Sequence, residues 1–437
     1  MRETAHMPAR ILIAGGGFGG LYAARELERR LPAGAADVTL VNDSNFLLYA
    51  PLLPGVGGGT LDPRHVVVPL REELRRTEVR IGTVVGADPQ RSVLRFEPPH
   101  ERTEELAYDH LIIALGSTSR HPDIPGLEEN SIPFKSVADA LIARDQVITT
   151  LEHAEEIDEP SERASHLGYV FAGGGYTGVE ALAELQDFAS DVIRYYPQSA
   201  KHGMRWVLVE GEPRIMKEIP APLAEFTTRE LQKRGIEVQT GVHVDEVTDR
   251  TVHLTTGETI AARTLVWTAG ITPCHAVIDL GLPLAERGRI KTDPAMRVDG
   301  HSNVWAIGDA AAVPDPAQRD TPCPQTAQHA LRQGRAVAGN IAAALGTGTE
   351  RPFSYKTKGV FAALGRHRGV AAVMGVKLRG FPAWFAARTY HLAAMPGNRR
   401  RMRLVSDWTL AMMFNRDSAA LGTPDTQGRR RPRTGLI

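Results

Sequence analysis

Apolar and polar residues follow the same order in two separate stretches of the chain. Each stretch has a short apolar run, a glycine-rich turn, a segment with apolar residues at helical spacing, and a second apolar run. The first reads "RILIAGGGFGGLYAARELERRL" from residue 10 and continues to "DVTLVND"; the second reads "YVFAGGGYTGVEALAEL" from residue 169 and continues to "WVLVE". A strand, a turn, a helix and a second parallel strand form a βαβ unit. The pattern therefore predicts an α/β fold with two such units.

The first glycine turn has the spacing Gly15-x-Gly17-x-x-Gly20. In a βαβ unit the first glycine permits the tight turn, the second lets a pyrophosphate approach the backbone, and the third lets helix and strand pack closely. The turn is predicted to bind a dinucleotide, although a glycine-rich turn without a ligand has the same local sequence. The second strand should end in an acid for the adenosine ribose. Asn42 stands at that position and Asp43 follows, so both are candidates.

The second turn repeats the spacing with Gly173, Gly175 and Gly178, and its second strand ends in Glu210. A carboxylate accepts hydrogen bonds from both ribose hydroxyls and repels a 2′-phosphate. The second unit is therefore predicted to prefer NAD(H) over NADP(H). The alternative is that Glu210 is an exposed carboxylate at the end of a strand, with no ligand.

A third nucleotide signal lies at residues 292–311, "TDPAMRVDGHSNVWAIGDAA". An apolar strand leads to Gly308, which permits close backbone approach, and to Asp309, which can accept a hydrogen bond from a ribityl hydroxyl. With "YDHLIIALGS" at 108–117 and the two turns, this order of motifs resembles the flavoproteins with two dinucleotide-binding domains. The resemblance covers roughly residues 8–345. It implies that FAD binds at the first turn and NAD(P)H at the second.

Within that group the chain most resembles type II NADH:quinone dehydrogenases. "GGGYTGVE" contains Glu180, which lies near the flavin and the quinone pocket in relatives, and "YKTKGVFAALG" contains Lys358, which lies near the flavin. "CPQTAQHALRQG" resembles the helix that relatives present to flavin and quinone, and it contributes Gln328. Arg332 stands where the last glutamine of that motif is usual. Each of these three candidate catalytic residues also has a structural interpretation. Glu180 lies in the first turn of a helix, where the helix dipole favours an acid. Lys358 can be a surface cation, and Gln328 can cover part of the core surface on an alanine-rich helix.

The resemblance implies a specific reaction and domain order. A hydride passes from NADH to FAD and two electrons then pass to a membrane quinone, menaquinone or ubiquinone, with Glu180 supplying protons and Lys358 stabilising charge on the reduced flavin. No proton pumping is expected. Two Rossmann-like domains are expected, an FAD-binding domain at 8–125 and 276–345 and an NAD(H)-binding domain at 126–275. A C-terminal α/β region at 346–437 follows, with amphipathic helices at the membrane surface.

The C-terminal region differs from the rest in charge. The whole chain has 51 basic residues (Lys and Arg) and 51 acidic residues (Asp and Glu). Residues 351–437 hold 17 of the basic and 3 of the acidic residues, so residues 1–350 hold 34 basic and 48 acidic residues.

Residues 380–421 interleave aromatic and apolar residues with arginines, and Pro396-Gly397 divides them into two helical pieces too short to span a bilayer. Interfacial helices on anionic lipid are predicted, at the cytoplasmic face of the cell membrane; a dimerisation helix pair is the alternative. The acidic remainder and the lack of a binding motif argue against nucleic acid. The expected lipid-facing residues are Trp384, Phe385, Tyr390, Leu392, Met395, Trp408, Leu410, Met412, Met413 and Phe414, with Arg399, Arg400, Arg401 and Arg403.

The cysteines limit the alternatives. Cys274 and Cys323 form neither a CxxC pair nor a metal-binding spacing, which disfavours a disulfide reductase and a metal site. A sulfide:quinone reductase would have little use for Glu210. Two alternatives stay open: a reductase of a soluble electron carrier or small quinone, and a non-enzymatic flavoprotein that responds to NAD(H).

Overall fold

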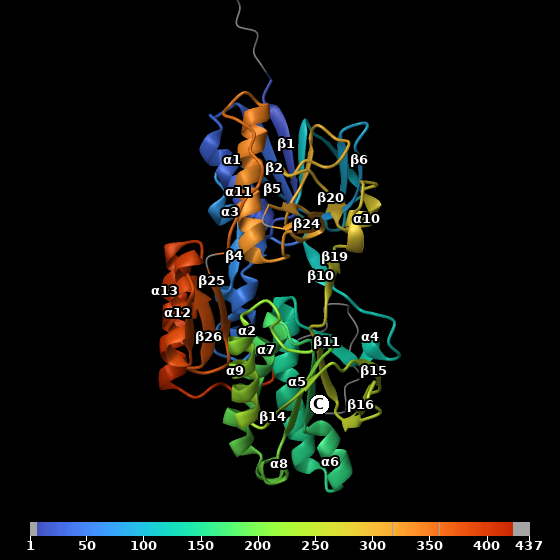
Figure 1. Cartoon of the computed structure of the whole chain (residues 1–437), viewed down its shortest axis with the longest axis vertical. Coiled ribbons are helices and arrows are strands. Elements are labelled where there is room, and N and C mark those ends of the chain that lie inside the picture. Colours follow the sequence, from blue (N-terminus) through green and yellow to red (C-terminus); the bar gives the residue numbers. More distant parts are fainter. Residues whose placement is uncertain (1–6, 317, 358, 423–437) are drawn as a thin grey trace, which may run out of the picture. The chain divides into compact units, whose positions relative to one another are not determined.

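The computed structural model describes residues 7–316, 318–357 and 359–422. The chain divides into two compact units, and each unit contains a five-stranded parallel sheet (Figure 1). Both predicted βαβ units are present, so the predicted α/β class is confirmed. The first unit comprises Met1–Leu48, Val67–Thr118 and Ile271–Thr357, and the second comprises Tyr49–Val66, Ser119–Gly270 and Lys358–Ile437.

The sheet of the first unit has the strand order β21-β9-β1-β2-β5. Its central strand is the apolar run of the first motif, in which Ile11 and Ile13 are fully buried because helices or loops cover both faces of a parallel sheet. The strands are β1 (Ala9–Ala14), β2 (Ala36–Asn42), β5 (Glu78–Ile81), β9 (His110–Ile113) and β21 (Val304–Ala306).

Helices α1 (Phe18–Arg30) and α11 (Ala327–Ala344) pack against each other in the first unit. Their contact is close because it is built from small residues: a Cβ on Gly334 would lie 2.2 Å from the carbonyl oxygen of Gly19. The remaining elements of this unit are β3 (Phe46–Leu48), β4 (Val67–Pro69), α3 (Leu70–Glu73), β6 (Thr83–Asp88), β7 (Val93–Glu97), β8 (Glu104–Ala107), α10 (Ala276–Asp279), η4 (Glu286–Gly288), β20 (Ile290–Lys291), η5 (Gly308–Ala310), β22 (Ala311–Ala312), β23 (Pro314–Asp315) and β24 (Gln318–Pro322).

The sheet of the second unit has the equivalent order β11-β18-β12-β13-β14, again with the strand before the glycine turn in the centre. Aromatic packing joins neighbouring strands, since the rings of Tyr169 and Trp206 stack with centroids 4.2 Å apart. The strands are β11 (Ser131–Pro133), β12 (Gly168–Ala172), β13 (Arg205–Glu210), β14 (Ile236–Thr240) and β18 (Thr264–Trp267).

Helix α5 (Val137–Glu156) begins at a capping box in which Ser136 and Asp139 satisfy each other's backbone N–H groups. Helix α7 (Tyr176–Val192) follows the second glycine turn and packs against α5 and α2 (Leu53–Gly57). The other elements are η1 (Ala50–Leu52), η2 (Pro63–His65), α4 (Leu127–Asn130), α6 (Pro160–His166), η3 (Ile193–Tyr195), α8 (Pro197–His202), α9 (Ala221–Lys233), β15 (Val244–Val247), β16 (Thr251–Leu254) and β17 (Thr259–Ala261). Strands β10 (Ser117–Ser119) and β19 (Ile271–Pro273) lie where the chain passes between the units.

The C-terminal region belongs to the second unit. Its antiparallel sheet consists of β25 (Gly359–Ala363), β26 (Gly369–Val373) and β27 (Val376–Arg379), and α12 (Phe381–Ala394) packs on it. Helix α13 (Asn398–Met413) follows after Pro396-Gly397, so the predicted division into two short helices is confirmed. Among the described residues, no helix combines the length and the apolar character that crossing a membrane requires.

Candidate active site

The first glycine turn has the geometry that its spacing predicts. Gly15 has φ 105°, and its N–H donates to Val41 O at 2.8 Å, which turns the chain at the end of the strand. A Cβ on Gly20 would lie 1.8 Å from the carbonyl oxygen of Gly15, so only glycine fits there. At Gly17 a Cβ would meet no described atom within 4 Å. Space is thus left over the backbone at the start of α1, where a pyrophosphate would bind.

Asn42 stabilises this turn. Its Oδ1 accepts from the N–H of Gly16 at 2.7 Å, and its Nδ2 donates to Ser44 O at 2.8 Å. The amide therefore uses both its acceptor and its donor character within the protein. The next residue, Asp43, is exposed at the end of the same strand. Both lie at the carboxyl end of β2, next to the glycine turn.

The second turn repeats this geometry closely. Gly173 has φ 109° and donates to Val209 O at 2.8 Å, and a Cβ on Gly178 would lie 1.9 Å from Gly173 O. A Cβ on Gly175 would again meet no described atom within 4 Å. The residues present therefore fit a second dinucleotide. A further polar group there is the hydroxyl of Tyr176, which is buried and has no hydrogen-bond partner among the described residues.

Glu210 takes the place of Asn42 in the second unit. Its Oε2 accepts from the N–H of Gly174 at 2.5 Å, and its Oε1 accepts from the N–H of Glu212 at 2.8 Å. Its side chain is partly exposed at the end of β13. The carboxylate holds the turn and still has lone pairs for ribose hydroxyls, because each carboxylate oxygen accepts more than one hydrogen bond.

The third motif lies in the first unit with the first turn. Gly308 has φ 75°, and Ser117 Oγ donates to Asp309 Oδ2 at 2.9 Å. The N–H of Gly308 donates to Gln333 Oε1 at 2.8 Å, and the Gln333 side chain is buried. Gln333 was not among the site residues predicted from the sequence. A glutamine on the buried face of a helix was the available signal, because such a side chain needs a polar partner.

Gln328 lies at the start of α11 in a small polar and aromatic cluster. Tyr355 donates its hydroxyl to Gln328 Oε1 at 2.9 Å. The guanidinium of Arg332 stacks 4.0 Å from the centroid of the Tyr355 ring and donates to Gln328 O at 2.9 Å. Arg332 therefore does not act as a free surface cation. It holds Tyr355, which in turn orients the Gln328 amide; sequence reasoning did not single out Tyr355.

Glu180 lies on α7, in the second unit. Its Oε1 accepts from the N–H of Ala363 on β25 at 2.8 Å. Desolvation by the surrounding protein, with a smaller contribution from Glu184, raises the pKa of Glu180 to about 8, although the bond from Ala363 opposes that shift. The carboxyl is therefore largely protonated near neutral pH. Lys358, the other residue predicted near the flavin, lies outside the described residues.

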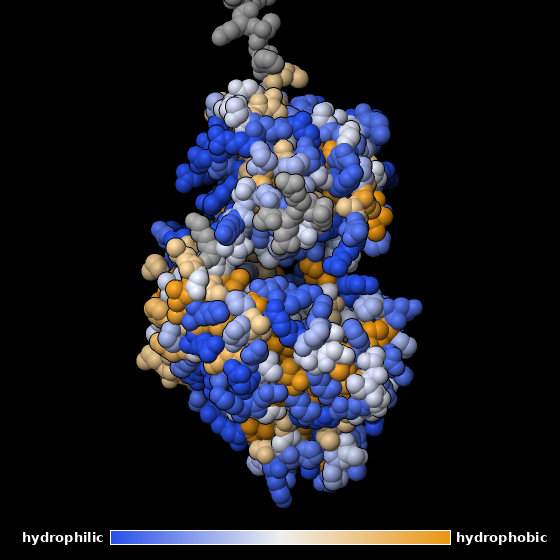
Figure 2. All heavy atoms as spheres, in the orientation of Figure 1, coloured by the Kyte–Doolittle hydropathy of each residue, from blue (hydrophilic) through white to orange (hydrophobic). Residues whose placement is uncertain are grey.

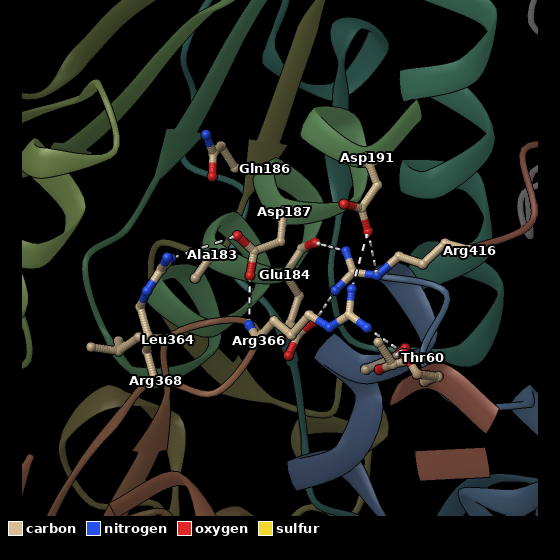
Figure 3. A network of polar contacts seen from close by, with 12 residues as sticks. Thr60, Ala183, Glu184, Gln186, Asp187, Asp191, Leu364, Arg366, Arg368 and Arg416 are labelled. Carbon is tan, nitrogen blue, oxygen red and sulfur yellow. Dashed lines mark hydrogen bonds and ion pairs between the residues drawn. The ribbon is translucent and has the colours of Figure 1, made fainter. Parts of the chain in front are cut away.

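Three further acids follow Glu180 along α7 and meet Arg234, at the end of α9, and arginines of the C-terminal region (Figure 3). Arg416 Nη2 lies 3.5 Å from Glu184 Oε2, and Arg416 Nε lies 3.6 Å from Asp191 Oδ2. Asp187 accepts from Arg234 Nη2 at 2.7 Å and from the N–H of Arg366. Burial raises the pKa of Glu184, and the charge of Arg416 opposes the shift.

The C-terminal helices expose part of the predicted apolar face. Figure 2 shows hydrophobic side chains gathered over α12 and α13. Of the residues expected to face lipid, Phe385, Leu410, Met412, Met413 and Phe414 are exposed. The prediction is wrong for Trp384, Met395, Trp408 and Arg400, which are buried. They are buried because the helices pack on their own sheet and on each other; Arg388, for example, stacks between Trp384 and Trp408 at 4.0 and 4.8 Å.

Both cysteines are free thiols. Burial raises the pKa of the Cys323 thiol to about 11, so little thiolate forms near neutral pH. This environment does not suit a redox-active pair.

Residues 9–334 match the family profile described as pyridine nucleotide-disulphide oxidoreductase. The match spans both glycine turns and the Gly308-Asp309 motif. The chain therefore belongs to the pyridine nucleotide-disulphide oxidoreductase family.

Its relatives narrow the class. Type II NADH:quinone oxidoreductase of Mycobacterium tuberculosis is 31% identical over 437 residues, which cover 94% of this chain and 90% of the relative. Demethylphylloquinone reductase of Synechocystis is 30% identical over 410 residues, which cover 91% of this chain and 95% of the relative. The predicted resemblance to type II NADH:quinone dehydrogenases is confirmed.

A solved structure agrees in fold. NDH2 from Plasmodium falciparum in complex with NADH superposes with a TM-score of 0.85 at 20% identity, over 94% of this chain and 99% of that chain. At that identity the likeness shows the fold.

Proposed function

We propose that the chain is an NADH:quinone oxidoreductase that uses FAD. The observation that carries this proposal is the pair of matched glycine turns, each at the centre of a parallel sheet, with a carboxylate at the strand end of only the second. FAD, when bound, accepts a hydride from NADH and delivers two electrons to a quinone. The residues of the chain bind, orient and supply protons.

The second turn is the proposed NADH site. The open backbone at Gly175 leaves room for the pyrophosphate at the start of α7, where the helix dipole favours an anion. Glu210 accepts hydrogen bonds from the adenosine ribose and would repel the 2′-phosphate of NADPH. Its bonds to Gly174 and Glu212 hold the carboxylate in place before the nucleotide arrives.

The first turn, with Gly308 and Asp309, is the proposed FAD site. Gly17 leaves room for the pyrophosphate in the same way. Ser117 and Gln333 hold Asp309 and Gly308 in place, so that Asp309 can accept from a ribityl hydroxyl. Asn42 keeps the turn closed, and Asp43, which is exposed, is the proposed partner of the ribose.

Three residues are proposed to serve the quinone and the reduced flavin. Glu180, protonated near neutral pH, donates its carboxyl proton to a quinone oxygen. The Gln328 side chain, whose oxygen accepts from Tyr355, is proposed to lie where the quinone enters. Lys358 is proposed from resemblance alone to stabilise charge on reduced flavin.

Anaerobic spectroscopy of the purified protein tests the reaction. NADH should bleach the flavin absorbance, NADPH should do so far more slowly, and a menaquinone or ubiquinone analogue should restore the absorbance. Bleaching by NADPH alone would contradict the role of Glu210. Bleached protein that no quinone reoxidises would favour a soluble electron carrier as acceptor, and a flavin that NADH does not bleach would favour a non-enzymatic role.

We further propose that the protein lies peripherally on the cytoplasmic face of the cell membrane. The exposed apolar residues at the C-terminal end of α13 lie on the same helix as Arg399 and Arg403, which are also exposed. Apolar residues can enter the headgroup region while the arginines contact anionic lipid, at about 1 kcal/mol per charge. A quinone dissolved in the bilayer would then be within reach.

Vesicle flotation separates this proposal from dimerisation. Wild-type protein should float with vesicles that contain phosphatidylglycerol, and the double variant Met413→Ser/Phe414→Ser should not. The variant Arg102→Ser, at an exposed arginine remote in sequence from α13, is the control. If flotation is unchanged in the double variant but sedimentation shows loss of a dimer, the exposed face serves a homodimer instead.

A further inference from the structure

A cavity in the first unit lies outside the proposed FAD site. It has a volume of about 470 Å³ and is bounded by the end of α1, one face of α11 and the segment that follows α11. None of the glycines of the first turn lines it, and neither do Asn42, Gly308 or Asp309. A volume of this size is in the range of small-molecule sites.

The lining of the cavity is strongly basic. Four arginines contribute to it, Arg30 from α1, Arg332 and Arg335 from α11, and Arg351 from the following segment, and the lining contains no Asp or Glu. By contrast, acidic residues exceed basic ones by 48 to 34 over residues 1–350. Arg30, Arg332 and Arg335 belong to that acidic part of the sequence, so the cavity is basic although the sequence around it is acidic on average.

Three of these guanidinium groups are positioned by the protein. Arg332 stacks on Tyr355 at 4.0 Å and Arg335 stacks on Tyr22 at 5.1 Å. Arg30 Nε pairs with Glu26 Oε1 at 2.5 Å. Stacking on an aromatic ring occupies the face of a guanidinium and leaves N–H groups at its edge for a ligand.

The wall that carries Arg351 is also fixed. The buried side chain of Asn340 donates from Nδ2 to Arg351 O at 3.0 Å and to Ala295 O at 2.9 Å, and its Oδ1 accepts from the N–H of Arg351 at 2.9 Å. These bonds hold the backbone of the segment against α11.

We propose that this cavity binds an anion that carries two or more phosphate groups. Arginine forks form paired, charge-assisted hydrogen bonds with phosphate oxygens, and several arginines match several phosphate charges. The hydroxyls of Thr349 and Ser354, which also line the cavity, add neutral donors. A neutral quinone has no use for four cations. The ligand is either a free phosphorylated compound or the headgroup of a diphosphate lipid, and both present the same chemistry.

The test is a binding measurement on the oxidised, FAD-loaded protein. Titration calorimetry with tripolyphosphate should show saturable binding that weakens at least tenfold between 50 and 500 mM salt, by ordinary screening. The charge-reversal variant Arg335→Glu/Arg351→Glu should weaken binding at least tenfold as well. Arg102→Glu, at an exposed arginine of the same unit outside the cavity, should leave binding unchanged. No substrate turns over in this assay, so its result is independent of the proposed reaction.

Vesicles distinguish the two sources of phosphate. Phosphatidylcholine vesicles with and without cardiolipin are added to the tripolyphosphate titration. Competition by cardiolipin vesicles alone, lost in the double variant, identifies a lipid headgroup; tripolyphosphate binding without competition identifies a free anion. Flavin absorbance and thermal unfolding check the fold, and the neutral pair Arg335→Gln/Arg351→Gln should give an intermediate loss. The proposal is overturned if wild-type protein binds neither probe, or if the double variant binds like Arg102→Glu.

Discussion

The two glycine turns have nearly identical backbones but differ in the residues around them. In each, the first glycine has φ near 105–109° and a Cβ on the third would lie 1.8 or 1.9 Å from its carbonyl oxygen. In each, a side chain from the next strand accepts from the N–H of the residue that follows the first glycine, Gly16 or Gly174. That side chain is an amide in the first unit and a carboxylate in the second. Steric limits at the glycines therefore determine the shape of the turn, and the residue at the end of the next strand determines the charge beside it.

The helices after the turns differ more. When the two motifs are aligned on their glycines, Tyr22 of α1 stands at the position of Glu180 on α7. Helix α1 packs through small residues against α11, whereas α7 presents acids to arginines of the C-terminal region. The contact between α1 and α11 thus depends on close backbone packing, and the contacts of α7 with the C-terminal region depend on buried charge. Changes at equivalent positions should have different consequences.

The largest expected effect comes from the third glycine of each turn. Gly20→Ala places a Cβ against Gly15 O, so the purified protein should lack FAD. Gly178→Ala places a Cβ against Gly173 O, so the protein should keep FAD and lose its reduction by NADH. Flavin absorbance after purification and anaerobic titration with NADH measure the two outcomes.

The matched control is Gly175→Ala, where a Cβ meets no described atom. This variant should keep the thermal stability of the wild type and bind NADH more weakly, because the methyl group occupies the space for the pyrophosphate. Normal reduction of Gly178→Ala by NADH would show that the two turns do not divide the nucleotides as proposed.

The next largest effect is expected at Arg416, whose side chain is 3% exposed. Arg416→Met removes the cation that interacts most strongly with the buried Glu184 and should lower the free energy of unfolding by about 3–5 kcal/mol. Urea denaturation followed by far-UV circular dichroism measures the loss. Because both residues lie in the second unit, FAD should stay bound to the folded protein.

The double variant Arg416→Met/Glu184→Met should recover most of that stability, because no buried charge is left unpaired. Arg399→Met, at an exposed arginine of α13, should change the free energy of unfolding by less than about 0.5 kcal/mol. Equal losses in Arg399→Met and Arg416→Met, both in the second unit, would show that the buried pair contributes no more to stability than an exposed arginine.

Glu180 should make stability depend on pH in a way that Tyr22 cannot. The pKa of Glu180 is raised from 4.5 to about 8, so the folded protein binds more protons than the unfolded chain between these pH values. The stability that its protonated form contributes is present at low pH and is lost as pH rises through about 8. Between pH 5 and 9, the free energy of unfolding of Glu180→Gln should therefore rise relative to wild type by about 1–3 kcal/mol.

Urea denaturation at pH 5, 7 and 9 measures this difference. Gln keeps an oxygen for the N–H of Ala363, so a loss of structure is not expected. The rate of quinone reduction separates the catalytic role from the structural one. It should fall in wild type as pH rises through about 8 and be low and flat in Glu180→Gln; parallel pH profiles would show that Glu180 is no proton donor.

The smallest effect should come from replacing the carboxylate at the end of β13 with an amide, the group that Asn42 places at the end of β2. In Glu210→Gln the amide oxygen can still accept from Gly174, as Asn42 accepts from Gly16. The turn should therefore keep its shape, while KM for NADH rises about tenfold, equal to about 1.4 kcal/mol, and the preference over NADPH falls. Steady-state kinetics with both nucleotides measures this. An unchanged preference would mean that Glu210 only supports the turn.

Local features of this chain could be predicted from the sequence. The glycine spacing, the strands before the turns and the break at Pro396-Gly397 follow from steric rules that operate over a few residues. The end of each second strand could be located for the same reason. The additional bonds that Asn42 and Glu210 make to their own turns could not, because they depend on how the strand and the turn meet.

Contacts between distant parts of the sequence could not be predicted. The bond between Gln333 and Gly308 joins a helix to a loop 25 residues earlier. Trp384 and Trp408 are of a residue type that often faces lipid, but a sheet and an arginine cover them. Hydrophobic periodicity identifies a buried face without identifying the residues that bury it.

The pairing of Arg416 with Glu184 also has a consequence for synthesis on the ribosome. The two residues are 232 positions apart, and the last segment of the first unit, Ile271–Thr357, is translated between them. At ordinary elongation rates, α7 leaves the ribosome roughly 10–50 s before its arginine is made. During that interval the acids of α7 must stay hydrated or protonated. The second unit, although its sheet is translated early, can complete its interior only when translation is almost finished.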